Sequence, residues 1–213
     1  KSLQLYEIWS SSKHRFIIMA RGTKKSRSFK SSAIVIIGEG LTEQFYFKHL
    51  RSLYNYHYTI KPYFFGTTSL KEMDSKICEV IKSCGIAVCV FDADVSERIE
   101  VEKKKLEQLR KKYGKKKNVI FCDSLPSIEY WFLLHYCNTN KYFKDSKSVE
   151  RVLRKFITQY EKKKDFLEKE NWVTNLCEEG KMEIAQQRAE FFSNKTGSYS
   201  NIYKIFERLT SGQ

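Results

Sequence analysis

Short apolar runs alternate with amphipathic stretches through the first 125 residues of the chain. Runs of Val, Ile, Ala, Phe and Cys predict strands, most of them buried, over residues 33–37, 58–65, 86–91 and 118–122. Apolar residues three or four positions apart predict helices between these strands, over residues 41–53, 69–82 and 96–113. Strands that alternate with helices in this way favour an α/β fold with a mainly parallel four-stranded sheet flanked by helices.

The pattern becomes purely helical after residue 125. A helix over residues 128–136 is apolar nearly all round, so we expect it to be buried with Trp131 and His135 in the core. Further helices are predicted over residues 149–164, 182–192 and 201–209, with breaks at 171–172 and 194–200. Residues 126–213 should therefore form a helical cap on an α/β core of about residues 31–125. The linker at residues 123–126 is too short to separate two domains.

Acidic residues directly follow two of the predicted strands. Gly38-Glu39-Gly40 follows the strand at 33–37, and Asp92-Ala93-Asp94 follows the strand at 86–91. In open α/β sheets ligands bind at the carboxyl ends of the strands, and Mg²⁺ prefers carboxylate oxygens. Asp92 and Asp94 are two residues apart on an extended strand end, so they share a face, and one Mg²⁺ could bind both. We expect a divalent-cation site here.

Charge points to a polyanionic partner. The 213 residues contain 39 Lys+Arg and 25 Asp+Glu, a net charge of +14 with a pI near 9.4, and nucleic acid is the leading candidate. A lysine-rich composition without special function is the alternative. Residues 1–30 are an N-terminal extension with a basic arm. The candidates for phosphate contacts are Arg21, Lys24, Lys25, Arg27, Lys103, Lys104, Arg110 and Lys111. The lysine run at 162–164 is typical of a solvated helix face.

Cysteine usage and hydropathy limit the class of protein. The six cysteines form no C-x-x-C pair, which argues against a zinc site, and show no disulfide-like spacing. No apolar run approaches the length of a membrane span. We expect a soluble protein in a reducing cytoplasm.

The ordered motifs resemble a known family. A strand followed by GEG-x-TE-x-x-YF (residues 38–47), then a strand ending in D-x-D, resembles the Toprim fold of topoisomerases, primases and OLD-type nucleases. The segment LPSIEYWFLLHY (residues 125–136) is similar to the PSFE-W-LLH stretch of RloB-like proteins. The GEG start of that family resembles residues 38–47 of this chain, and its basic N-terminal arm resembles residues 21–30. The resemblance covers Ala20 to the C-terminus and leaves residues 1–18 unmatched.

This resemblance implies a Toprim nuclease dependent on Mg²⁺ or Mn²⁺ that cleaves tRNA, other RNA or DNA. The setting implied is bacterial or archaeal phage defence, abortive infection or a restriction-linked system, beside an AAA/ABC-type ATPase partner. Glu39 resembles the Toprim glutamate, which acts as general acid or base or helps to hold the metal, while Asp92 and Asp94 hold it. Glu43 is either a carboxylate near the metal or a helix N-terminal charge. Glu129 either reaches the metal or caps its helix.

Two other readings use the same residues. A degenerate Toprim module would bind nucleic acid or the ATPase as a scaffold, without turnover and without need of metal. A haloacid-dehalogenase-like phosphatase would use Asp92 as the phosphorylated nucleophile and Asp94 as acid or base. That fold normally places the nucleophile strand first, whereas an α/β unit precedes it here, so the phosphatase ranks last.

Overall fold

A five-stranded sheet lies at the centre of the computed structural model, which describes residues 33–61, 69–94, 99–193 and 196–210. All of these residues belong to one compact unit, Ser31–Gln213. The predicted basic arm, with Arg21, Lys24, Lys25 and Arg27, lies outside the described residues. The strand order is β2-β1-β3-β4-β5. The strands are β1 Ile34–Gly38, β2 Tyr58–Lys61, β3 Ile86–Asp92, β4 Val119–Leu125 and β5 Tyr199–Ser200.

The first four strands are parallel, which confirms the α/β class. The prediction of four strands is wrong, because β5 adds a fifth, antiparallel strand beside β4. It is only two residues long and pairs with Ser124 and Leu125, so it has no alternating pattern of its own by which the sequence could reveal it. The strand predicted over 58–65 is described only as far as Lys61, since residues 62–68 lie outside the described part of the chain.

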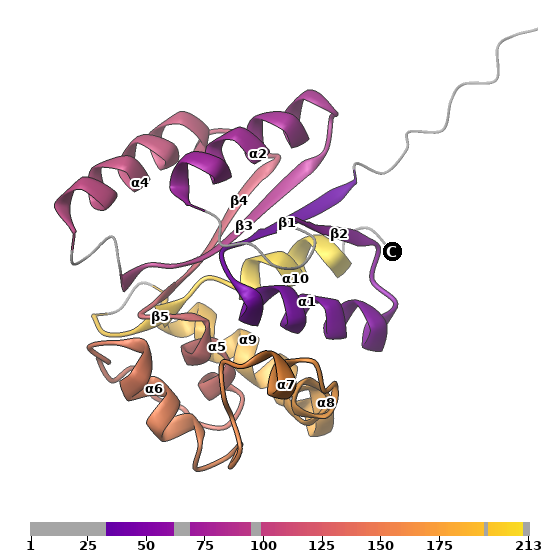
Figure 1. Ribbon diagram of the computed structural model, residues 1–213, viewed down its shortest axis with the longest axis vertical. Helices are drawn as coiled ribbons and strands as arrows, with labels where there is room; N and C mark the ends of the chain where they lie inside the picture. The colour runs from indigo at the N-terminus through magenta and orange to yellow at the C-terminus, as the bar shows by residue number, and fades with distance from the viewer. Residues whose placement is uncertain (1–32, 62–68, 95–98, 194–195, 211–213) are drawn as a thin grey trace, which may run out of the picture. The chain divides into compact units, whose positions relative to one another are not determined.

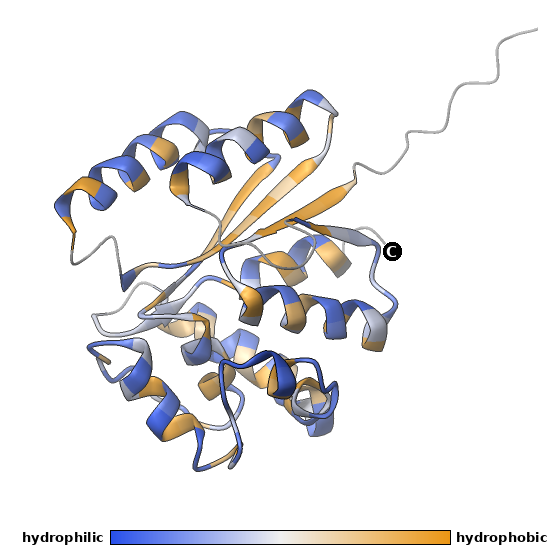
Figure 2. Cartoon of the chain, viewed as in Figure 1, coloured by the Kyte–Doolittle hydropathy of each residue, from blue (hydrophilic) through white to orange (hydrophobic). Residues whose placement is uncertain are grey.

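Alternate residues of each central strand face two separate hydrophobic clusters. Ile36 and Val88 face one cluster, and Ile37 and Cys89 face the other. Figure 1 shows the helices that cover the two faces, α2 and α4 on one side and α1 and α10 on the other. Their bounds are α1 Leu41–Tyr54, α2 Leu70–Lys82, α4 Glu100–Tyr113 and α10 Tyr203–Thr210. In Figure 2 the strands are largely apolar, whereas the helices carry apolar residues along one side only.

The C-terminal cap contains short helices: α5 Ile128–Leu134, α6 Ser146–Leu153, α7 Lys164–Leu167, α8 Asn171–Cys177, a 3₁₀ turn at Glu178–Gly180, and α9 Lys181–Phe192. The single helix predicted over 149–164 is wrong, because α6 ends at Leu153. The chain then turns so that Tyr160 is buried against Phe132 and Trp172, with Arg154 Nε donating to the Tyr160 carbonyl at 2.9 Å. The break predicted at 171–172 is also wrong, since α8 begins there.

Helix α5 is the centre of the larger cluster. All seven of its residues are buried, as the sequence predicts. Trp131 is fully buried, and its Nε1 donates to the hydroxyl of Tyr46 at 2.7 Å. His135 is buried beside the Trp131 ring, and burial lowers the pKa of its imidazole to about 3. The expected core histidine is confirmed. No helix among the described residues has the length and apolar character needed to cross a membrane.

Candidate functional site at the carboxyl ends of β1 and β3

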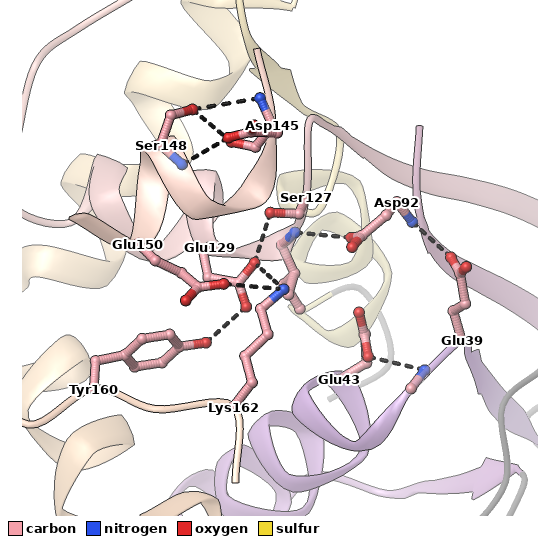
Figure 3. Close-up of polar contacts among 12 residues, drawn as sticks. Glu39, Glu43, Asp92, Ser127, Glu129, Asp145, Ser148, Glu150, Tyr160 and Lys162 are labelled. Carbon is pink, nitrogen blue, oxygen red and sulfur yellow. Dashed lines mark hydrogen bonds and ion pairs between the residues drawn. The ribbon is translucent and has the colours of Figure 1, made fainter. Parts of the chain in front are cut away.

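Two carboxylates meet where the parallel strands β1 and β3 end. Glu39 directly follows β1, and Asp92 is the last residue of β3. Because the two strands are neighbours, the Glu39 side chain reaches across, and its Oε2 accepts the backbone N–H of Asp92 at 2.8 Å. Figure 3 shows the Glu39 carboxylate against the backbone nitrogen of Asp92, with the Asp92 carboxylate pointing away from it at this edge of the sheet. The adjacency expected from the strand ends is therefore present.

The first turns of α1 and α5 bring two further groups to the same edge, the carboxylate of Glu43 and the backbone N–H of Ile128. Glu43 is buried in the first turn of α1, and its Oε2 accepts the backbone N–H of Gly40 at 3.0 Å. A Cβ added at Gly38 would lie 3.2 Å from the Cβ of Glu43, so the turn between β1 and α1 favours glycine there. The carboxylate of Asp92 in turn accepts the backbone N–H of Ile128 at 2.9 Å, and thereby caps α5.

Glu129 has no exposed surface and is held by three donors. The hydroxyl of Ser127 donates to its Oε2 at 2.6 Å, and the hydroxyl of Tyr160 donates to its Oε1 at 2.7 Å. The ammonium of Lys162 lies 2.9 Å from Oε2 and 3.7 Å from an oxygen of Glu150, on α6. Both oxygens of Glu129 are therefore occupied by groups of the protein itself (Figure 3).

Lys162, Tyr160 and Ser127 are site residues that sequence reasoning missed. The interpretation of the 162–164 lysines as a solvated helix face is wrong for Lys162, which pairs with a buried carboxylate and is not on a helix. No local pattern distinguishes Lys162 from Lys163 and Lys164. For Glu129 the sequence did indicate a partner, because an acidic residue in an apolar helix needs a cation or hydrogen-bond donor beside it. The sequence could not identify which residue supplies that cation.

The carboxylates raise one another's pKa. For Asp92 the causes are burial and then the charges of Glu43 and Glu129, and its pKa is raised well above the usual range. Burial, with Glu129 and Glu39 nearby, raises the pKa of Glu43 to about 7. Lys162 opposes these shifts, since it lowers the pKa of both groups. Ionising these carboxyls together therefore requires a compensating positive charge, which Lys162 supplies in part and a bound cation would supply further.

Glu39 and Asp94 are linked by charge. Burial raises the pKa of Glu39, and the Asp94 carboxylate raises it further. Asp94 is buried just beyond the end of β3. The charges that act on Asp92 come instead from Glu43, Glu129, Lys162 and Glu39. Of the five predicted metal ligands, the structure thus brings Glu39, Glu43, Asp92 and Glu129 into one cluster, with Asp94 next to Glu39.

The chemical type of the clustered side chains suits a hard divalent cation. All members are carboxylates, and one ammonium opposes them. As the side chains stand, no three His, Cys, Asp or Glu residues in the described part of the chain are arranged to hold a metal ion. The reason is visible in the hydrogen bonds, since Glu39, Glu43 and Asp92 each direct one oxygen to a backbone N–H. Binding a cation would require these carboxylates to turn toward a common point.

The predicted phosphate contacts on α4 lie on the side of the sheet opposite α1 (Figure 1). Arg110 is paired with the buried Asp123 at 2.5 Å, and Lys104 lies 3.8 Å from Glu100 of its own helix. Lys103 and Lys111 are exposed. Arg110 therefore joins α4 to the end of β4, a contact that the sequence did not predict.

Comparison with known proteins assigns the chain to a family. None of the curated proteins and none of the solved structures matches it. A family model described as RloB-like protein matches residues 34–209, which include β1, the acidic cluster and almost all of the cap. The resemblance inferred from the GEG and LPSIEYW segments is thereby confirmed, and the chain belongs to the RloB-like protein family.

Proposed function

We propose that this protein is a nuclease of the Toprim type that cleaves phosphodiester bonds with the help of Mg²⁺ or Mn²⁺. The observation that carries the proposal is the cluster of the buried Glu43 and the half-buried Glu39 and Asp92 at the carboxyl ends of two parallel strands, with Lys162 as the cation facing it. A site of this charge attracts a divalent cation, and the chain's net charge of +14 attracts a polyanion.

The residues divide into two groups by their contacts. Asp92, Asp94 and Glu39 would hold the cation, with Glu43 beside them. The bound ion would supply charge neutralisation of the phosphate and a lowered pKa for water. Glu39, whose pKa is raised by burial, is suited to move a proton at the attacking or leaving oxygen. Glu129 is left outside the metal-binding set, because three protein donors already occupy it, and we assign it to holding Lys162.

One observation favours a second candidate. Each of the three carboxylates already accepts a backbone N–H, so the cluster also has a structural role at the ends of β1 and β3. A protein in which this is the only role would bind nucleic acid, or an ATPase partner, as a scaffold without cleavage. The phosphatase alternative gains nothing from the structure, since β3 is an internal strand preceded by two others.

The test is a cleavage assay on tRNA, single-stranded RNA and plasmid DNA, with Mg²⁺ or with a chelator, and with added lysate as a source of partner. Asp92→Asn keeps an oxygen for the Ile128 N–H, so we expect it to fold and to lose cleavage. Asp165→Asn, at an exposed position of α7, is the matched control and should cleave normally. Full activity in Asp92→Asn would refute the metal assignment. Metal-independent binding with no cleavage by any variant would favour the scaffold.

A phage-defence or restriction-linked setting, with an AAA/ABC-type ATPase as partner and the cytoplasm as location, belongs to the same proposal. It rests on the family and on no contact in the structure. Copurification of the full-length chain with an ATPase from its own cells, followed by the same cleavage assay, tests this part of the proposal.

A further inference from the structure

The cap carries a concentration of positive charge next to the acidic cluster. Residues 141–164 contain nine Lys or Arg and three Asp or Glu, an excess of six positive charges in 24 residues. This segment includes α6 and also Lys162, whose ammonium lies at the carboxylates. Positive charge is thus unevenly distributed along the chain, and the positive excess in the cap includes Lys162 at the site itself.

Helix α6 presents its basic residues outward. Val149 and Leu153 are buried, and Glu150 faces Lys162 at 3.7 Å, which fixes the inner side of the helix. Lys147 and Arg151 are one turn apart and exposed, and Lys155 follows one turn later, just beyond the end of α6. In the described part of the chain, the structure gives none of these three a carboxylate partner. They form what we call the α6 track: Lys147, Arg151 and Lys155.

Most of the α4 cations contrast with the α6 track. On α4 the cations at 104, 105, 110 and 112 pair with carboxylates, two on α4 itself and two on neighbouring elements. Lys103 and Lys111 are exposed and, among the described residues, have no carboxylate partner, so they differ from the α6 track only in their place on the fold. A paired cation gains less from a phosphate, because it must first give up its carboxylate. The α6 track also lies on the element that touches the site, since Glu150 of α6 contacts Lys162 (Figure 3).

Exposed aromatic rings stand on both sides of the α6 track in the chain. Tyr142, four residues before α6, is 57% exposed, and Phe156, three residues after it, is 42% exposed. Phe156 stacks on Tyr136 with ring centroids 5.0 Å apart, so its ring is held in place. Cations combined with exposed rings bind single-stranded nucleic acid, whose unpaired bases can stack, better than duplex, whose bases are covered.

We propose that the α6 track is the surface along which a single-stranded polynucleotide approaches the carboxylates, with Tyr142 and Phe156 as stacking contacts for its bases. The proposal rests on the proposed function, because it places the substrate of that site. It replaces α4 as the main phosphate-binding surface of the described residues and narrows the substrate class from nucleic acid in general to single strands.

The experiment measures binding by fluorescence anisotropy with a labelled single-stranded RNA 20-mer, its DNA counterpart and the matching duplex, in chelator to prevent cleavage. The track variant is Lys147→Gln/Arg151→Gln/Lys155→Gln. The control variant, Lys103→Gln/Lys111→Gln/Lys116→Gln, removes the same charge from exposed positions on and just after α4. Thermal unfolding of both variants should match wild type, because all six side chains are exposed.

We expect the track variant to bind single strands at least tenfold more weakly than wild type, and the control variant to stay within about threefold. The slope of log affinity against log salt should fall by about 2 units in the track variant, since each phosphate contact on a single strand contributes about 0.7. Tyr142→Ala/Phe156→Ala should weaken single-strand binding and leave duplex binding unchanged.

Equal losses in the track and control variants would overturn the α6 track while leaving a nucleic-acid-binding protein, so the proposed function would survive. Tighter binding of the duplex than of either single strand would overturn the choice of substrate class. Absence of binding to all three probes by the wild-type chain would overturn the track together with the proposed function.

Discussion

Replacing Glu43 by Gln should stabilise the metal-free protein at alkaline pH. The wild-type carboxyl has a pKa of about 7 in the folded state against an ordinary value of 4.5, chiefly because it is buried. Glutamine keeps an oxygen for the Gly40 N–H, which Glu43 now accepts at 3.0 Å, and it removes the ionisable group. The variant therefore avoids the free energy that the wild-type chain spends on ionising a buried carboxyl.

The sign and size follow from proton linkage. A group with a raised folded pKa stabilises the fold fully below its unfolded pKa, and this contribution is lost as the pH rises through the folded pKa. For Glu43 the window runs from 4.5 to about 7. At 1.36 kcal/mol per pKa unit, the penalty of wild type is about 1 kcal/mol at pH 5 and about 3 kcal/mol at pH 8. The advantage of Glu43→Gln should thus grow by about 2 kcal/mol between these pH values.

Urea denaturation followed by circular dichroism, at pH 5 and pH 8 in chelator, measures this difference directly. The control is Glu168→Gln, an exposed position just after α7, which should give no pH-dependent difference from wild type. Adding Mg²⁺ at pH 8 should stabilise wild type more than Glu43→Gln, because a bound cation favours the ionised carboxyl. A Glu43→Gln variant whose stability relative to wild type does not change with pH would refute this account of the acidic cluster.

Two further predictions concern the core of the cap. Trp131→Ala should lower the free energy of unfolding by about 3 to 5 kcal/mol, measured by urea denaturation, since the ring is fully buried and its Nε1 donates to Tyr46; a loss below 1 kcal/mol would contradict its place in the core. His135 has a folded pKa of about 3 against 6.5, so its stabilising contribution is present above pH 6.5 and is lost as the pH falls. His135→Gln should therefore gain about 2 kcal/mol relative to wild type between pH 7 and pH 5, and parallel pH profiles of the two proteins would show that the histidine is not buried in its neutral form.

The order of strands and helices in the α/β core was predictable because the signals are local. Alternation of two residues along β1 and β3 and the helical spacing in α1 and α2 are properties of short segments. The positions of Glu39 and Asp92 at strand ends followed from the same segments. Parallel neighbours then place such ends together, so the meeting of these two carboxylates was also within reach of sequence reasoning.

The cap was predicted less well, because its elements depend on distant partners. Helix α6 ends at Leu153 where the sequence pattern continues, since Tyr160 is drawn into the core and its hydroxyl bonds to Glu129, 31 residues away along the chain. Strand β5 exists through its pairing with the end of β4, 76 residues earlier at the contact between Ser124 and Ser200. Neither contact leaves a periodic trace in the local sequence.

The chemistry of the site shows the same division. Residue type and local pattern already placed Glu39 and Asp92 near one another, because both lie at strand ends, and left open whether Glu43 joins them or only opens its helix. Only the tertiary structure selects Lys162 from three consecutive lysines and sets its ammonium against Glu129. In a run of identical lysines, the local sequence does not indicate which side chain will pair with a buried carboxylate. The role of Lys162 is decided by which buried carboxylate the folded chain brings within reach.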